Sequence, residues 1–278
     1  MPLPLTTADL IQCFLEISAK IKLMFVWFIL FCFLLIILFF LSRSFSKNLY
    51  LLFFYLTKDK QHAVSLLTWV FLPGTVIHEL SHLLMAELLR VRTGELSFTP
   101  EIRENNEIRV GALKMAKTDP LRHSLIGLAP ILVGITTIAS LSHFVLFPLA
   151  QKTFSLSFRP LNYQLLITNY FLLFGTCYLV LCVSNTMFSS KKDLEAILFP
   201  LIIIAVLGGA FWLGDFEISF SLKTISFFTN LFKKLNLALM GTVVIDSGFL
   251  GMTKILLKSQ KQKTVNNFYG SSSKHQQS

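Results

Sequence analysis

The segment from Leu72 to Arg90, LPGTVIHELSHLLMAELLR, places two histidines and a glutamate in an otherwise almost entirely apolar run. Residues four apart on a helix lie on one face, with Cβ atoms about 5 to 6 Å apart, so His78 and His82 can turn toward one zinc ion. Glu79 lies about 100° around the helix from His78, close enough to reach a metal-bound water without being a ligand. The motif therefore predicts zinc ligands at His78 and His82 and a general base at Glu79 for attack of water on a carbonyl.

A structural interpretation of such residues must be weighed beside the catalytic one. A lone His or Glu in a membrane span often packs helices or lines a pore, and Glu87, near the end of the same run, fits that description. Three ionisable groups within five residues are different, because leaving them unpaired at membrane depth costs on the order of several kcal/mol, which a metal would offset. We therefore favour the metal site.

Zinc hydrolases usually take three protein ligands and keep the fourth position for water, so a third ligand must come from elsewhere in the chain. The remaining histidines precede a span, lie near the ends of a span or fall in the tail, which favours a carboxylate. The carboxylates near or within apolar runs are Asp193, Glu195, Asp215 and Asp246.

The composition is that of an integral membrane protein. Of 278 residues, 54% are hydrophobic and 14% are charged, with 28 phenylalanines and a mean hydropathy of +0.65. A hydrocarbon core of about 30 Å needs roughly 20 apolar residues per helix. Runs of that kind predict six spans, at 23–42, 63–89, 124–149, 161–187, 194–213 and 235–257. The shorter run LYLLFFYL at 49–56 is interpreted as interfacial or as a helix extension.

The distribution of charged residues predicts the orientation of the chain across the membrane. The net charge is +10, but the Lys and Arg residues lie between spans, where they fix topology or meet lipid headgroups, so nucleic-acid binding is not expected. Placing 90–122 in the cytoplasm puts the larger share of the 25 basic residues on that side. Asp193 then follows the cytoplasmic end of the fourth span, on the same side as the end of the HELSH helix, whereas Asp215 falls on the opposite side.

The segment 95–115 carries short alternating apolar groups around the polar RENNE, a pattern typical of a β-hairpin beside the membrane.

The sequence thus predicts an all-α polytopic membrane protein with about six transmembrane helices and a small membrane-adjacent β-hairpin. Its expected parts are an N-terminal anchor span and connecting segment at 1–62, a membrane core at 63–213 with the hairpin at 91–120, an additional span at 214–257, and a disordered basic tail at 258–278.

Together, GTVIHELSH inside a span, the hairpin, a Pro-containing span and a late Asn and Asp resemble the site-2 protease family of intramembrane zinc metalloproteases. The resemblance covers about half of the chain, from Thr68 to Leu213. In that family an Asp is the third ligand, commonly eight residues after an Asn, and here Asn185 and Asp193 keep this spacing, although the family's prolines and final Gly are missing. GLAPILVG at 127–134 matches only as a packing segment of small residues.

The resemblance implies a zinc-dependent protease that cuts transmembrane proteins or peptides, with His78, His82 and Asp193 as ligands and Glu79 as the base. It also implies a multi-pass protein of the cell membrane whose active site faces the cytoplasm, and a hairpin that holds the unwound substrate as an added strand. An ordinary juxtamembrane loop is the alternative for the hairpin.

Two rival functions stay open. In another class of membrane zinc protease, Glu195 would replace Asp193 as the third ligand. In a non-enzymatic membrane protein, a structural zinc site would be closed by four protein ligands. Asp246 lies within the last span, and it either lines an access route or is a helix-packing carboxylate.

Overall fold

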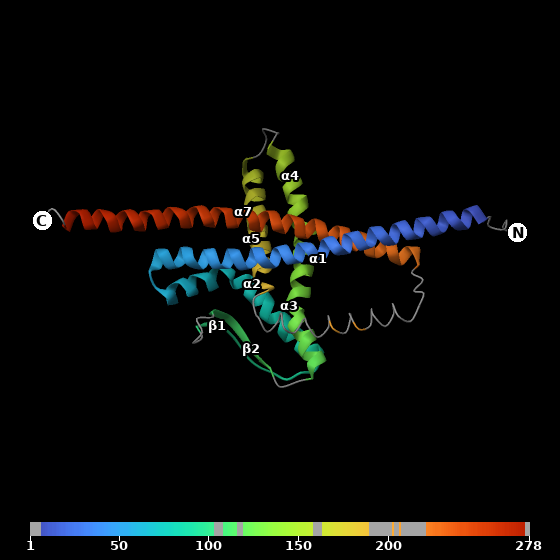
Figure 1. The fold of residues 1–278 in the computed structure, drawn as a ribbon, viewed down its shortest axis with the longest axis horizontal. Helices are drawn as coiled ribbons and strands as arrows, with labels where there is room; N and C mark the ends of the chain where they lie inside the picture. Colours follow the sequence, from blue (N-terminus) through green and yellow to red (C-terminus); the bar gives the residue numbers. More distant parts are fainter. Residues whose placement is uncertain are drawn as a thin grey trace.

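In the computed structural model, the described residues are 7–102, 108–115, 119–157, 163–188, 202, 206 and 221–275. In chain order the elements are α1 (Thr7–Thr57), α2 (Lys60–Leu88), β1 (Thr93–Ile102), β2 (Ile108–Met115), α3 (Pro120–Leu141), the π-helix η1 (Ser142–Leu146), α4 (Phe147–Ser157), α5 (Tyr163–Thr186) and α7 (Leu222–His275). The described chain is almost entirely helical (Figure 1).

Five helical segments within the described residues are long and apolar enough to cross a membrane, as expected for a membrane protein. They are Ser18–Thr57, Lys60–Leu88, Pro120–Lys152, Ile167–Thr186 and Leu222–Gln262. Of the predicted span at 194–213, the structure describes only residues 202 and 206, and the site candidate Asp193 lies outside the described residues.

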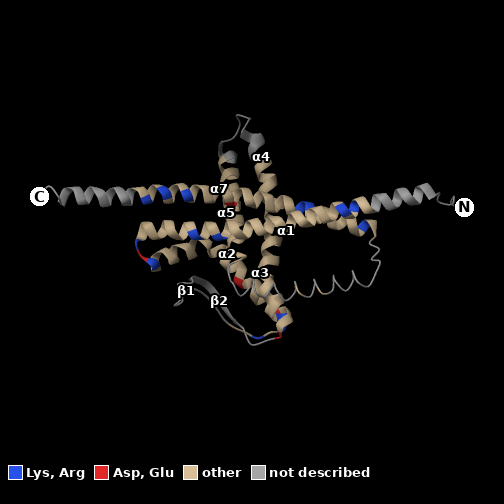
Figure 2. Ribbon diagram, viewed as in Figure 1, with Lys and Arg blue, Asp and Glu red and all other residues tan. Residues whose placement is uncertain are grey.

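The longest helices, α1 and α7, lie side by side and run in the same direction (Figure 1). The Nδ2 of Asn236 donates to the carbonyl of Trp27 near the start of the pair, and Lys261 lies over the ring of Tyr55 near its end. Both helices carry a mainly apolar stretch of about the same length. It is 23–42 in α1, and in α7 it lies between Lys234 and Lys254, where Asp246 is the single charged residue. Basic residues gather on either side of these stretches (Figure 2). Twenty helical residues extend about 30 Å, the thickness of the hydrocarbon core.

The parallel pair differs from the predicted topology, because six spans that cross in alternation would make the first and last helices antiparallel. Two further observations concern the ends of these helices. LYLLFFYL is a continuation of α1, which is one of the two interpretations given above. The backbone at 258–275 is helical, whereas a disordered tail is predicted for this segment. The physical reason is that its Lys and Gln residues are good helix formers and no proline interrupts the turn that leaves the span.

The two strands form a small antiparallel ladder beside the helices. Thr93 lies opposite Met115, and Ile102 lies opposite Ile108, with irregular register between Ser97 and Pro100. The predicted polar turn RENNE, at 103–107, is outside the described residues. The ladder follows directly on the end of α2, so it lies close to the helix that carries HELSH (Figure 1).

Two apolar clusters hold the helices together. The first joins α1, α3, α5 and α7 through residues that include Leu38, Ile138, Val183, Met187 and Leu239. The second joins α1, α2, α5 and α7 through residues that include Phe45, Phe71, Leu181 and Leu250. The last turns of α5 contribute to both clusters, so this helix end is the common contact of the surrounding helices.

Candidate metal centre

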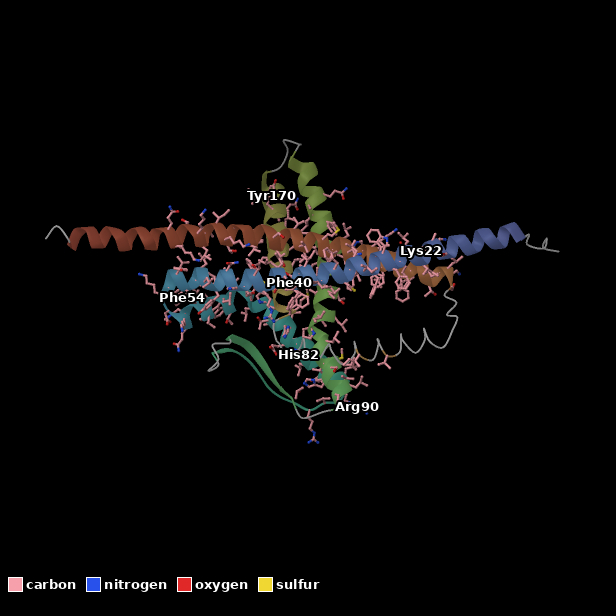
Figure 3. All side chains as sticks on the ribbon, in the orientation of Figure 1. Lys22, Phe40, Phe54, His82, Arg90 and Tyr170 are labelled. Atoms are coloured by element: carbon pink, nitrogen blue, oxygen red, sulfur yellow. The ribbon has the colours of Figure 1, made fainter. Side chains whose placement is uncertain are left out.

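The HELSH segment lies in α2 and is buried by the surrounding helices. His78, Glu79 and His82 are each only 5 to 6% exposed, on a helix whose opposite face exposes Leu80, Leu84 and Leu88. Figure 3 shows His82 where α2 and α3 meet, on the side of the molecule that carries the strands. The polar face of the segment therefore points into the protein, and its apolar face points outward.

The two histidine rings converge. The Nε2 atoms of His78 and His82 are 3.2 Å apart, and the ring centroids are 4.8 Å apart. Two imidazole nitrogens bound to one tetrahedral zinc at about 2.0 to 2.1 Å would be roughly 3.4 Å from each other. The spacing and the chemistry of the donor pair thus fit two ligands of a single zinc ion.

A backbone contact fixes the orientation of the second histidine. Nδ1 of His82 donates to the carbonyl oxygen of Ile126 in α3, at 2.9 Å. Since a carbonyl oxygen can only accept, Nδ1 carries the hydrogen and the neutral ring keeps the lone pair of Nε2 for a metal. Histidines that bind metals commonly use their other ring nitrogen in this way. No sequence pattern could have predicted this contact, because the acceptor is a main-chain atom 44 residues away.

Close packing against α5 places the helix that carries HELSH. A Cβ atom on Gly74 would lie 2.3 Å from the carbonyl oxygen of Cys182 and 2.6 Å from Oγ1 of Thr186, so only glycine permits this approach. Gly74 is one turn before His78, which puts the last turn of α5 next to the start of the motif. The order of the contacts, Tyr178 with Val70 and Thr186 with Gly74, shows that α2 and α5 run parallel here.

Helix α2 bends along its length, so that its second half runs toward α3 (Figure 1), and Pro73 lies inside this helix. Proline has no N–H and interrupts the helical ladder. In the turn before it, the carbonyl of Val70 accepts from the hydroxyl of Tyr178 at 2.7 Å and from the thiol of Cys182 at 3.3 Å. Side chains of a neighbouring helix thus donate to backbone oxygen beside the proline, as expected at membrane depth.

The other candidates are placed as follows. His62 lies in the first turn of α2, where its backbone N–H donates to Asp59, while His123 and His143 are in α3 and η1. Asn185 is buried in the last turn of α5, and Asp246 is buried in α7. Among the residues that the structure describes, no group of three or more His, Cys, Asp or Glu side chains is arranged to hold a metal ion. Asp193, Glu195 and Asp215 lie outside those residues.

No protein-family model matches the sequence, and no curated protein or solved structure matches it either.

Proposed function

We propose that this chain is an intramembrane zinc metalloprotease that hydrolyses peptide bonds in or near the transmembrane segments of its substrates. The observation that supports this most directly is the buried pair of His78 and His82, whose Nε2 atoms converge to 3.2 Å beside Glu79. A zinc ion held there would polarise a peptide carbonyl and activate water. Glu79, in the same helical turn, would accept the proton.

The proposal assigns Asp193 as the third ligand. Two considerations support it. None of the carboxylates or histidines within the described residues completes a group of three with His78 and His82. The last turn of α5 contacts Gly74, one turn from His78, and Asp193 is seven residues after Thr186 along the chain. Seven residues reach at most about 25 Å, so the distance along the chain is compatible with a ligand to the same ion.

The burial of the site favours a membrane substrate over a soluble one. A peptide bond must reach His78 and His82 through a protein whose described surface exposes many Leu, Ile and Phe side chains. Such a surface faces lipid, so a hydrophobic helix can approach it laterally, while a soluble peptide cannot. The paired strands β1 and β2, close to α2, offer main-chain groups to an unwound segment of the substrate.

The test uses the purified full chain in detergent, with zinc measured per chain and cleavage of a transmembrane-helix reporter followed by mass spectrometry. Wild type should bind about one zinc and cut the reporter. Glu79→Gln should keep the zinc and lose cleavage, and Asp193→Asn should lose the zinc. Glu87→Gln is the matched control, since Glu87 is exposed on the same helix.

Each rival function has its own signature in this experiment. Loss of zinc in Glu195→Gln with zinc retained in Asp193→Asn would move the third ligand to Glu195. If wild type binds zinc but does not cut the reporter, and Glu79→Gln leaves the zinc content unchanged, the site would be structural. A wild-type chain without zinc would remove the metal-site interpretation altogether.

A further inference from the structure

The last turn of α5 is held by polar contacts from two helices that do not carry the HELSH motif. The hydroxyl of Ser42 in α1 donates to the backbone carbonyl of Asn185 at 3.0 Å. The hydroxyl of Ser184 donates to Oδ2 of Asp246 in α7 at 2.8 Å. On a third side, Cys182 and Thr186 contact Gly74 of α2. A single helical turn therefore connects α1 and α7 with the helix of the candidate metal centre.

This polar group is completely enclosed. Ser184 and Asp246 are 0% exposed, and Ser42 and Asn185 are also buried. Val183 and Met187 of the same turn belong to one apolar cluster, and Leu181 and Cys182 belong to the other. With apolar side chains on either side and lipid outside, hydrogen bonds here are strong, and losing a partner is costly.

Asp246 depends on α5 for its hydrogen bonding. Its other carboxylate oxygen, Oδ1, has no hydrogen-bond partner within the part of the chain that the structure describes, and no described Lys, Arg or His forms an ion pair with it. If Asp246 served helix packing alone, an apolar residue would serve better. An apolar side chain in the middle of a span packs without the desolvation cost of a carboxyl group. Its specific contact is the hydroxyl one residue before Asn185.

We propose that Asp246 is a positioning residue of the metal centre: through Ser184 it fixes the last turn of α5, from which the chain leads to Asp193. This inference rests on the proposed function and adds to it that α7 controls how the last turn of α5 packs against the helix that carries HELSH. Hydrogen bonds from α1 and α7 hold this turn against Gly74, so loss of the bond to α7 would let the turn move relative to His78 and His82.

The test measures metal binding and does not rely on catalysis. Full-length protein is loaded with Co²⁺, whose visible absorption reports the number and geometry of its ligands, and zinc affinity is measured by chelator competition. Asp246→Val should alter the Co²⁺ spectrum and weaken zinc binding by about 10- to 100-fold, as loss of supporting contacts commonly does. Asp246→Asn should remain close to wild type, because its amide oxygen can still accept from Ser184.

Two further variants separate positioning from general packing. Ser184→Ala removes the same contact from the α5 side and should reproduce the effect of Asp246→Val, without further loss in the double variant. Asn236→Leu breaks a buried contact between α7 and α1 at Trp27, away from α5, and should leave the spectrum unchanged.

The outcomes distinguish the two proposals. A wild-type spectrum and affinity in Asp246→Val and in Ser184→Ala would overturn the positioning role while leaving the protease proposal intact. An equal change in Asn236→Leu would also overturn it, since any loosening of α7 would then suffice. A wild type that binds neither Co²⁺ nor zinc would remove the proposed function, and the positioning role with it.

Discussion

Gly74 of α2 and Cys182 of α5 are in such close contact that a Cβ atom on Gly74 would lie 2.3 Å from the Cys182 carbonyl oxygen. This contact sets the distance between the helix that carries HELSH and the helix end that carries Asn185. Small residues commonly allow helix backbones to approach in membranes, where packing rather than hydrophobic burial drives association. At Gly74 the approach leaves no room even for a methyl group.

Gly74→Ala should therefore separate α2 from α5 and weaken the metal centre. Overpacking of this kind costs typically about 1 to 3 kcal/mol, and the clash here is with backbone atoms that cannot rotate away. We expect a lower thermal unfolding midpoint in detergent and reduced zinc binding. Gly175→Ala is the control, because a Cβ on Gly175 in α5 would meet nothing within 4 Å. Equal behaviour of the two variants would show that the close approach at Gly74 is not needed.

Histidine nuclear magnetic resonance can test the assigned ring state of His82. With ¹⁵N-labelled histidine in zinc-free protein at neutral pH, His82 should carry its hydrogen on Nδ1, because that nitrogen donates to the Ile126 carbonyl. Adding zinc should then shift the Nε2 signals of His78 and His82 while the signals of His123, which is exposed at the start of α3, stay in place. A hydrogen on Nε2 of His82 would contradict the assignment.

Tyr178→Phe tests the hydrogen bond to α2 beside Pro73. The variant removes the hydroxyl that donates to the carbonyl of Val70 and leaves the ring in place. The expected loss in the free energy of unfolding is about 0.5 to 1.5 kcal/mol, the usual contribution of one hydrogen bond. Tyr50→Phe in α1, whose ring stacks on Phe54, is the control in the same thermal unfolding measurement. If both variants unfold at the same temperature, the thiol of Cys182 or the helix backbone is a sufficient hydrogen-bond donor to the carbonyl of Val70.

Asp59, in the turn between α1 and α2, makes stability depend on pH. The carboxylate accepts hydrogen bonds from the backbone N–H of His62 and then from its ring, and these hold the pKa of Asp59 below its ordinary value of 3.8. A carboxyl with a lowered folded pKa stabilises the fold above its ordinary pKa, and that contribution is lost as pH falls through the lower folded value.

Two substitutions of Asp59 separate the effect of the helix cap from the effect of the titrating carboxyl group. Asp59→Ala should lower the unfolding midpoint at neutral pH, because the cap of α2 is lost. Asp59→Asn should keep much of the cap but no longer respond to acid in this range. The carboxyl ¹³C shift of Asp59, titrated in wild type, gives the pKa directly, and a value at or above 3.8 would contradict the prediction.

The chemistry of the candidate centre was readable from the chain because it is local. His78 and His82 are one helical turn apart, so any helix brings them to one face, and the converging rings follow from that spacing. The membrane character could be predicted for the same reason, since an uninterrupted apolar run of about 20 residues is typical of a transmembrane helix. The family resemblance also paired Asn185 with Asp193, but Asp193 lies outside the described residues and its role stays a prediction.

Contacts between distant segments were decided only by the tertiary structure. The carbonyl of Ile126 that orients His82, the approach of Cys182 to Gly74 and the bond from Ser184 to Asp246 join residues from 44 to 108 positions apart. The parallel course of α1 and α7 also could not be inferred, because hydropathy reports whether a helix can cross a membrane and says nothing about its neighbour or direction. The residue types and their spacing along one helix determine which ligands are available, while packing between helices determines where those ligands point.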